Sequence, residues 1–215
     1  NTELSVYGSG INIKVGAILR VTEQLKLGAA LHSPTMYNIE ETYNTSISST
    51  FSDYKLSKSS QIYIFKHNLI TPWKAILSAS TILKDKILIN ADYEIVDYAA
   101  ARMFSDEYDF ENENNTIKGL YSKTANIRIG AEMNLSPFVI RTGYSKYESP
   151  TTNKDFNKEN YSFGLGINHN NYYFDAAYVL SQGRNEHLLY NEDYIKPVAL
   201  VNTNHNLIFT LGFRH

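Results

Sequence analysis

Apolar side chains recur at every second position along most of this chain, which is the period of a β-strand and not of an α-helix. The residues between them are polar, small or charged. The pattern therefore predicts strands with one apolar and one polar face. The clearest apolar faces are Ile11, Ile13, Val15, Ala17, Leu19 and Val21; Ala125, Ile127, Ile129, Ala131 and Met133; Phe138, Ile140, Thr142 and Tyr144; Tyr161, Phe163, Leu165 and Ile167; Tyr172, Phe174, Ala176, Tyr178 and Leu180; and Leu207, Phe209, Leu211 and Phe213.

Turn signals divide the chain into about nine strands. The expected strands are 9–22, 25–47, 60–83, 86–104, 125–134, 137–148, 159–169, 172–184 and 200–214. Their connections alternate between short turns and long polar loops, at about 48–59, 105–124, 148–160 and 185–200. Pro72 predicts a kink or bulge in the third strand, and 115–123 predicts one helical turn. The expected fold is a single domain, 1–215, that forms an antiparallel up-and-down β-structure.

The alternation fits either a soluble β-sandwich or a transmembrane β-barrel. Many of the expected strands reach the roughly 9–11 residues that cross a bilayer, and their apolar faces often begin or end in Tyr or Phe. Charges share the polar face in the six strands above, as a wet lumen requires, although Asp97 breaks this rule in 86–104. We therefore predict a transmembrane barrel, in which Asp97 lies beyond the apolar band.

Composition and motifs argue against several other functions. The formal net charge of −2 does not favour nucleic-acid binding, and the absence of Cys excludes disulfides and thiol catalysis. No nucleophile–base motif is present, and the six histidines show no ligand spacing. We expect no enzyme activity, no cofactor and no metal. One acidic loop could hold a divalent cation, but a solvated external loop is the favoured interpretation of Asp106, Glu107, Asp109, Glu111 and Glu113.

Five stretches resemble the C-terminal part of the FadL/TodX-type outer membrane transport family, in particular its Bacteroidetes-like members. They are 25–43, 71–98, 126–150, 161–180 and 209–215. The resemblance implies a 14-stranded barrel with an N-terminal hatch, which admits long-chain fatty acids or other hydrophobic compounds. The nine strands would be its last nine, with the hatch and the first strands missing. His215 stands where such barrels usually carry an aromatic residue.

The parity of the strands assigns residues to the lumen. A network of paired charges is expected there, and aromatic residues of the lumen or outer loops are the candidate ligand contacts. The network candidates are Arg20, Asp92, Glu94, Arg128, Glu132, Arg141 and Asp175, with Lys14, Lys26 and His32 also facing inward; the ligand candidates are Tyr37, Tyr43 and Tyr63.

The expected function is passive uptake of hydrophobic compounds across the bacterial outer membrane. The expected partners are the lipid bilayer with its lipopolysaccharide and a hydrophobic cargo, with no nucleic acid, and the barrel is expected to be a monomer. Two alternatives remain open: a structural or adhesive barrel whose long loops bind a partner, and a soluble β-sandwich that binds a ligand.

Overall fold

The computed structural model describes the chain except for residues 51–53, 170, 188–197 and 214–215, so His215 lies outside the described part. The described residues form fourteen strands, one α-helix and one short 3₁₀-helix. All strand pairs are antiparallel and belong to two sheets. The antiparallel meander that the sequence predicts is therefore confirmed.

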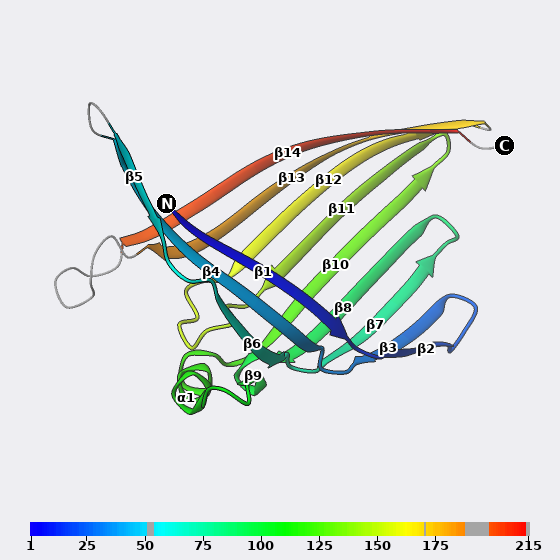
Figure 1. Ribbon diagram of the computed structural model, residues 1–215. Helices are drawn as coiled ribbons and strands as arrows, with labels where there is room; N and C mark the ends of the chain where they lie inside the picture. Colours follow the sequence, from blue (N-terminus) through cyan, green and yellow to red (C-terminus); the bar gives the residue numbers. More distant parts are fainter. Residues whose placement is uncertain (51–53, 170, 188–197, 214–215) are drawn as a thin grey trace.

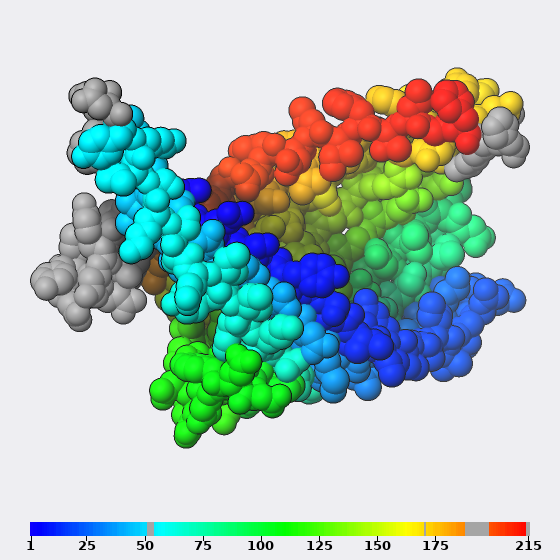
Figure 2. All heavy atoms as spheres, in the orientation of Figure 1, coloured from blue at the N-terminus to red at the C-terminus, as the bar shows by residue number. Residues whose placement is uncertain are grey.

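The larger sheet has nine strands in the order β14-β13-β12-β11-β10-β8-β7-β3-β2. In Figure 1 it forms a curved wall, and Figure 2 shows a hollow between β14 and the N-terminal strands in front of it. β14 and β2 are its two edges. The strands are β2 (Lys14–Arg20), β3 (Leu25–His32), β7 (Lys74–Leu83), β8 (Ile87–Asp97), β10 (Lys123–Leu135), β11 (Phe138–Tyr147), β12 (Lys158–Asn168), β13 (Tyr172–His187) and β14 (Val198–Phe213).

The smaller sheet has five strands in the order β1-β4-β6-β9, with β5 paired to β4. Its strands β1 and β4 cross in front of the wall in Figure 1. The strands are β1 (Thr2–Ile11), β4 (Met36–Thr50), β5 (Lys55–Ser59), β6 (Tyr63–Ile70) and β9 (Arg102–Phe104). β5 lies wholly within 48–59, which the sequence predicted as a loop, so that part of the prediction is wrong.

Four long stretches of chain run from one sheet into the other, and each is interrupted at the same level. The interruptions lie at 12–13, 33–35, 71–73 and 98–101, between β1 and β2, β3 and β4, β6 and β7, and β8 and β9. We call this row of interruptions the belt. The kink expected at Pro72 in 60–83 is confirmed, whereas the prediction that 9–22, 25–47 and 86–104 are unbroken strands is wrong. A continuous ladder is impossible at Pro72, which has no N–H to donate.

Hydroxyl groups replace part of the lost ladder in the belt. The Ile13 amide donates to Ser33 Oγ at 2.9 Å, and the Thr35 amide donates to Thr71 Oγ1 at 2.9 Å. The Thr71 amide in turn donates to the Thr35 carbonyl at 3.0 Å. Adjacent strands thus stay bonded through the belt although their backbones leave the regular pleat.

The nine-stranded sheet exposes its apolar face and buries parts of the opposite one. On β12, Phe163 and Leu165 are 50% and 52% exposed, whereas Gly164 and Gly166, which alternate with them, are buried. Val139, on the same side as these glycines, is 1% exposed. The β-sandwich interpretation is therefore wrong, because a sandwich would press the apolar faces together.

The long loop between β9 and β10 contains the helix α1 (Glu111–Leu120). The sequence predicted one helical turn at 115–123. A helix is present there, but it begins earlier and has 10 residues. The Tyr121 amide closes it by donating to the Ile117 carbonyl at 3.0 Å. No helix among the described residues is long and apolar enough to span a membrane.

Candidate functional site: a charged wall and a cleft at the belt

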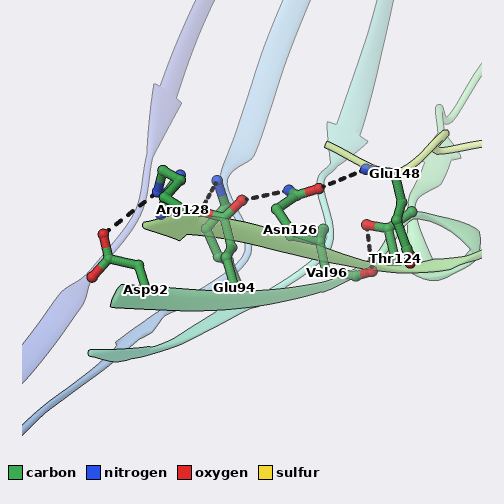
Figure 3. Close-up of polar contacts among 8 residues, drawn as sticks. Asp92, Glu94, Val96, Thr124, Asn126, Arg128 and Glu148 are labelled. Carbon is green, nitrogen blue, oxygen red and sulfur yellow. Dashed lines mark hydrogen bonds and ion pairs between the residues drawn. The ribbon is translucent and has the colours of Figure 1, made fainter. Parts of the chain in front are cut away.

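A first group of charges joins β7, β8 and β10 on the inner side of the wall (Figure 3). The strand register places Arg128 directly opposite Asp92, and their side chains approach to 3.5 Å. Arg128 also lies 3.5 Å from Glu94, and Lys74 of β7 lies 3.4 Å from the same carboxylate. Ser78 donates to Asp92 at 2.6 Å. Cross-strand pairing of opposite charges stabilises a sheet, so this group ties the three strands together.

Glu94 is the most enclosed member of this group, because its side chain is only 8% exposed. Asn126, directly opposite on β10, donates to its Oε1 at 2.8 Å. The Asn126 side-chain oxygen then accepts the backbone amide of Glu148 at 3.1 Å. Glu94 therefore has two cations and one amide as partners, which compensate for its burial.

A second group of charges joins β10, β11 and β13. Arg141 lies directly opposite Glu132, and its Nε donates to the Glu132 carboxylate at 2.7 Å. Its Nη1 bonds Asp175 of β13, reaching over the intervening strand β12. Gly164 and Gly166 of β12 are the residues paired with Arg141 and Asp175. The absence of side chains at these glycines leaves the space through which the guanidinium reaches its second partner.

The structure thus brings six of the seven predicted network residues into two ion-pair groups. Arg20, the seventh, stands opposite Lys26 at the end of β2 and belongs to neither group. Lys74, Ser78 and Asn126 join the first group and were not predicted. The alternation along each strand predicts which face of the sheet these side chains lie on. Their partners depend on the register between strands that are distant in sequence.

A cleft of about 690 Å³ lies on this inner side at the belt. Both sheets, η1 (Tyr98–Ala100) and α1 contribute to its wall. Its lining is Asn12, Lys14, His32, Ser33, Thr35, Leu69, Thr71, Pro72, Lys74, Val96, Tyr98, Ala101, Met103, Ile117 and Tyr121. The volume lies within the range of about 300–1,000 Å³ that is usual for small-molecule sites.

Three basic residues form a row in this cleft. Lys14 on β2 is paired with His32 on β3, which is paired with Lys74 on β7. Three apolar side chains, Leu69, Met103 and Ile117, line the cleft beside them. Basic groups next to an apolar wall suit a molecule that has an anionic head and a hydrocarbon tail.

The tyrosines predicted as ligand contacts lie on strands and not in loops. Tyr43 of β4 is directly opposite Tyr63 of β6, and they are 44% and 62% exposed. Tyr37 lies on the same face of β4, near the belt, between Gly10 and Leu69. The structure therefore brings Tyr43 and Tyr63 together and leaves Tyr37 apart from them.

An aromatic cluster on β6 and the following loop was not predicted. The ring of Phe65 lies 5.3 Å from that of His67 and 6.0 Å from that of Phe110, and Tyr108 packs edge-on against Phe110 at 4.9 Å. The Tyr108 hydroxyl donates to Glu113 at 2.8 Å, and this bond to a carboxylate raises the pKa of Tyr108. The cluster fixes the start of the acidic loop against the five-stranded sheet.

Within the described ranges, no three His, Asp or Glu side chains gather in a way that could hold a metal ion. This holds for the acidic loop at 106–113, whose carboxylates bond locally instead. Asp109 accepts the backbone amide of Glu111 at 3.0 Å, next to the N-terminus of α1. Carboxylates at this end of a helix are favoured by its dipole.

Known proteins resemble the chain in structure and not in sequence: no family model and no curated protein matches it. A FadL homologue of Pseudomonas aeruginosa shares 11% identity at a TM-score of 0.48, over 96% of this chain and 67% of that one. The monoaromatic hydrocarbon channel CymD shares 12% sequence identity at a TM-score of 0.51, over 92% of this chain and 48% of CymD. The toluene transporter TodX of P. putida shares 11% sequence identity at a TM-score of 0.45, over 92% of this chain and 46% of TodX.

The chain thus spans about half the length of CymD and TodX and 67% of the FadL homologue. At 12% identity the likeness to CymD bears on the fold. Together with the antiparallel meander and its exposed apolar face, it confirms the predicted architecture. The chain therefore has a fold similar to that of the hydrocarbon channel CymD.

Proposed function

We propose that this chain forms part of the wall of a bacterial outer-membrane channel that admits hydrophobic compounds, among them long-chain fatty acids, by passive diffusion. Three observations support this function. The fold is that of a membrane barrel, the outward face of the nine-stranded sheet is apolar, and a cleft of suitable size opens on the inner side of the wall. The partners would be the lipid and lipopolysaccharide of the outer membrane, with the protein as a monomer.

The cleft at the belt is the observation that carries the proposal. Its basic row would hold a carboxylate, because Lys14, His32 and Lys74 lie side by side on three neighbouring strands and, among the described residues, only Lys74 forms an ion pair, with Glu94. Its apolar lining would hold the first part of the hydrocarbon chain. The ion-pair groups below the cleft keep the wall in one shape and are not themselves a path for apolar cargo.

The whole channel would be larger than the part described. Among the described residues, no strand pairs with the outer edges of β14 and β2, and lipid does not tolerate unpaired backbone groups. In a 14-stranded barrel, further strands would pair with both edges, and a hatch would close the lumen. Cargo would partition into the cleft from outside, and a shift of the hatch would let it leave sideways or downward.

Uptake by vesicles that contain the full-length protein tests the proposal. We expect uptake of a long-chain fatty acid above that of empty vesicles. Lys14→Gln should lower fatty acid affinity about two- to fivefold, since an exposed ion pair contributes up to about 1 kcal/mol. It should not alter uptake of the corresponding neutral alcohol.

Lys26→Gln is the matched control. Lys26 of β3 lies on the same inner face of the sheet as Lys14 and His32, but it does not line the cleft. It should leave both uptakes unchanged. Uptake no faster than in empty vesicles would reject the channel function. Fatty acid uptake that is indifferent to Lys14→Gln would retain the channel and reject the cleft as the site of the head group.

A further inference from the structure

The belt separates two parts of the wall whose outward faces differ in polarity. Below it, the outward face of the nine-stranded sheet is almost continuously apolar. Its exposed members include Leu19, Leu27, Leu31, Leu77, Ile129, Phe138, Phe163, Leu165, Phe174, Leu207, Phe209 and Leu211. Charges on this face lie near the long-loop ends of the strands, where Asp97 is paired with Lys123 and Lys146 with Glu159.

The cleft shows which face of the five-stranded sheet is its inner one. Leu69 of β6 and Met103 of β9 line the same cleft as Lys14, Lys74 and Val96 of the nine-stranded sheet. These residues therefore lie on one continuous side of the wall. The residues that share the face of Leu69 on β4 and β6 are consequently inward, and their neighbours in sequence are outward.

The alternation shifts by one residue in three of the four interrupted strands. Even-numbered residues face inward below the belt, as Lys74 and Val96 do, whereas odd-numbered residues face inward above it, as Leu69 and Met103 do. The strand formed by β1 and β2 keeps its parity, since Asn12 and Lys14 both line the cleft. A one-residue shift moves every following side chain to the other face.

This shift reverses the polarity of the wall above the belt. The outward face of the five-stranded sheet is mainly polar and carries Ser5, Tyr7, Ser9, Asn38, Glu40, Thr42, Lys66 and Asn68 beside Ile64. Its inward face is mainly apolar and carries Leu4, Val6, Ile39, Tyr43, Tyr63, Phe65 and Leu69 beside Glu41 and His67. Lys66 and Glu40 form an outward ion pair at 3.1 Å, with 69% and 43% of their side chains exposed. Charges in this position are compatible with water and costly in hydrocarbon.

We propose that the belt marks the level at which the wall leaves the bilayer. The lipid-contacting surface is then the outward face of the nine-stranded sheet, and the five-stranded sheet stands outside the membrane in water. β8 has 11 residues below the belt, which matches the roughly 9–11 residues of a tilted membrane-crossing strand. The outward apolar residues Ile11, Met36 and Ile70 adjoin the belt, so the hydrocarbon ends just beyond it.

Asp97 also fits this boundary. Its side chain accepts the amide of Ala99 at 3.2 Å and caps η1, within the belt itself. The exception to the parity of charges is thereby a marker of the membrane surface. The inference rests on the proposed outer-membrane location. It adds that β4 and β6, on the far side of the belt from β3 and β7, lie outside the bilayer.

Leu77 and Ile64 provide a matched pair for the test. Both are outward aliphatic residues of the β6–β7 segment, 57% and 56% exposed, on opposite sides of the belt. The described chain has no native cysteine, so Leu77→Cys and Ile64→Cys can be spin-labelled singly in the full-length protein in lipid vesicles. Collision with oxygen, which concentrates in lipid, and with a water-soluble nickel complex is then measured by electron paramagnetic resonance.

We expect the label at position 77 to collide preferentially with oxygen and the label at position 64 with the nickel complex. Leu165→Cys and Ser5→Cys form a second pair with the same expectation, should a variant of the first pair fail to fold. Oxygen preference at both 64 and 5 would overturn the boundary alone. Nickel preference at 77 and 165 would remove the membrane placement and, with it, the proposed function.

Discussion

Gly166 illustrates how single residues shape the inner side of the wall. A methyl group at this position would collide with the carboxylate of Asp175 and would lie 3.2 Å from Nη1 of Arg141. The same two groups form the ion pair that reaches across β12. Gly164, two residues earlier on the same face, has more space, because a methyl group there would meet its nearest atoms at 3.5–3.7 Å.

We therefore expect Gly166→Ala to destabilise the protein by roughly 1–3 kcal/mol, as overpacking usually does. Gly164→Ala, the matched control, should change the free energy of unfolding by less than about 0.5 kcal/mol. Urea titration of the protein in lipid vesicles measures both. Equal effects of the two substitutions would show that the space over Gly166 does not serve the Arg141–Asp175 pair.

The sequence could predict the side of these charges and not their partners. Alternation along one strand is local, so Asp92, Glu94 and Arg128 could be assigned to a common face without a structure. Their partners follow from strand register, which places Ser78 opposite Asp92 although 14 residues separate them. For the same reason Lys74 was missed.

The belt is the feature that matters at the scale of the elements. Pro72 shows one interruption in the sequence, but the interruptions at 33–35 and 98–101 became evident only when four strands were seen side by side. Their one-residue shifts could not be predicted, because a shift is defined by the neighbouring strands. Of the two settings expected for the ligand candidates, lumen or outer loop, Tyr37 and Tyr43 take the first, because they lie on the inward face of β4.

Thr71 provides a test of how the belt is held. Its Oγ1 accepts the Thr35 amide, so Thr71→Val removes an acceptor at nearly constant volume. We expect a loss of about 1–2 kcal/mol, because a partly buried amide is left without its partner. Thr81→Val, on the outward face of the same β7 segment, should be neutral or slightly stabilising. Equal losses in urea titrations of the two variants would argue against the hydroxyl bond as a support of the belt.

At the scale of the whole molecule, two solvents explain the arrangement of the side chains. Below the belt, apolar residues face outward and paired charges inward. Above it, most polar side chains, with the Lys66–Glu40 pair, face outward and most apolar ones face inward. Alternation alone predicts strands with one apolar and one polar face, which both a barrel and a sandwich have, and the exposure of the apolar face is what distinguishes the two. Phe209 and Leu211 of β14, 66% and 61% exposed, have no apolar layer over them in the described part of the chain.

A substitution on each side of β12 tests the placement of these solvents. Leu165 faces outward in the middle of the strand and is 52% exposed, so Leu165→Arg should cost roughly 2–4 kcal/mol if hydrocarbon surrounds it. Ser162 faces the inner side, where Arg141 and Arg128 already lie, and Ser162→Arg should cost far less because the new cation can reach water and carboxylates. Equal costs, measured by urea titration in vesicles, would mean that both faces of β12 meet the same solvent. In that case the inner side would not be an aqueous lumen, and the cleft at the belt would lose its route to the interior.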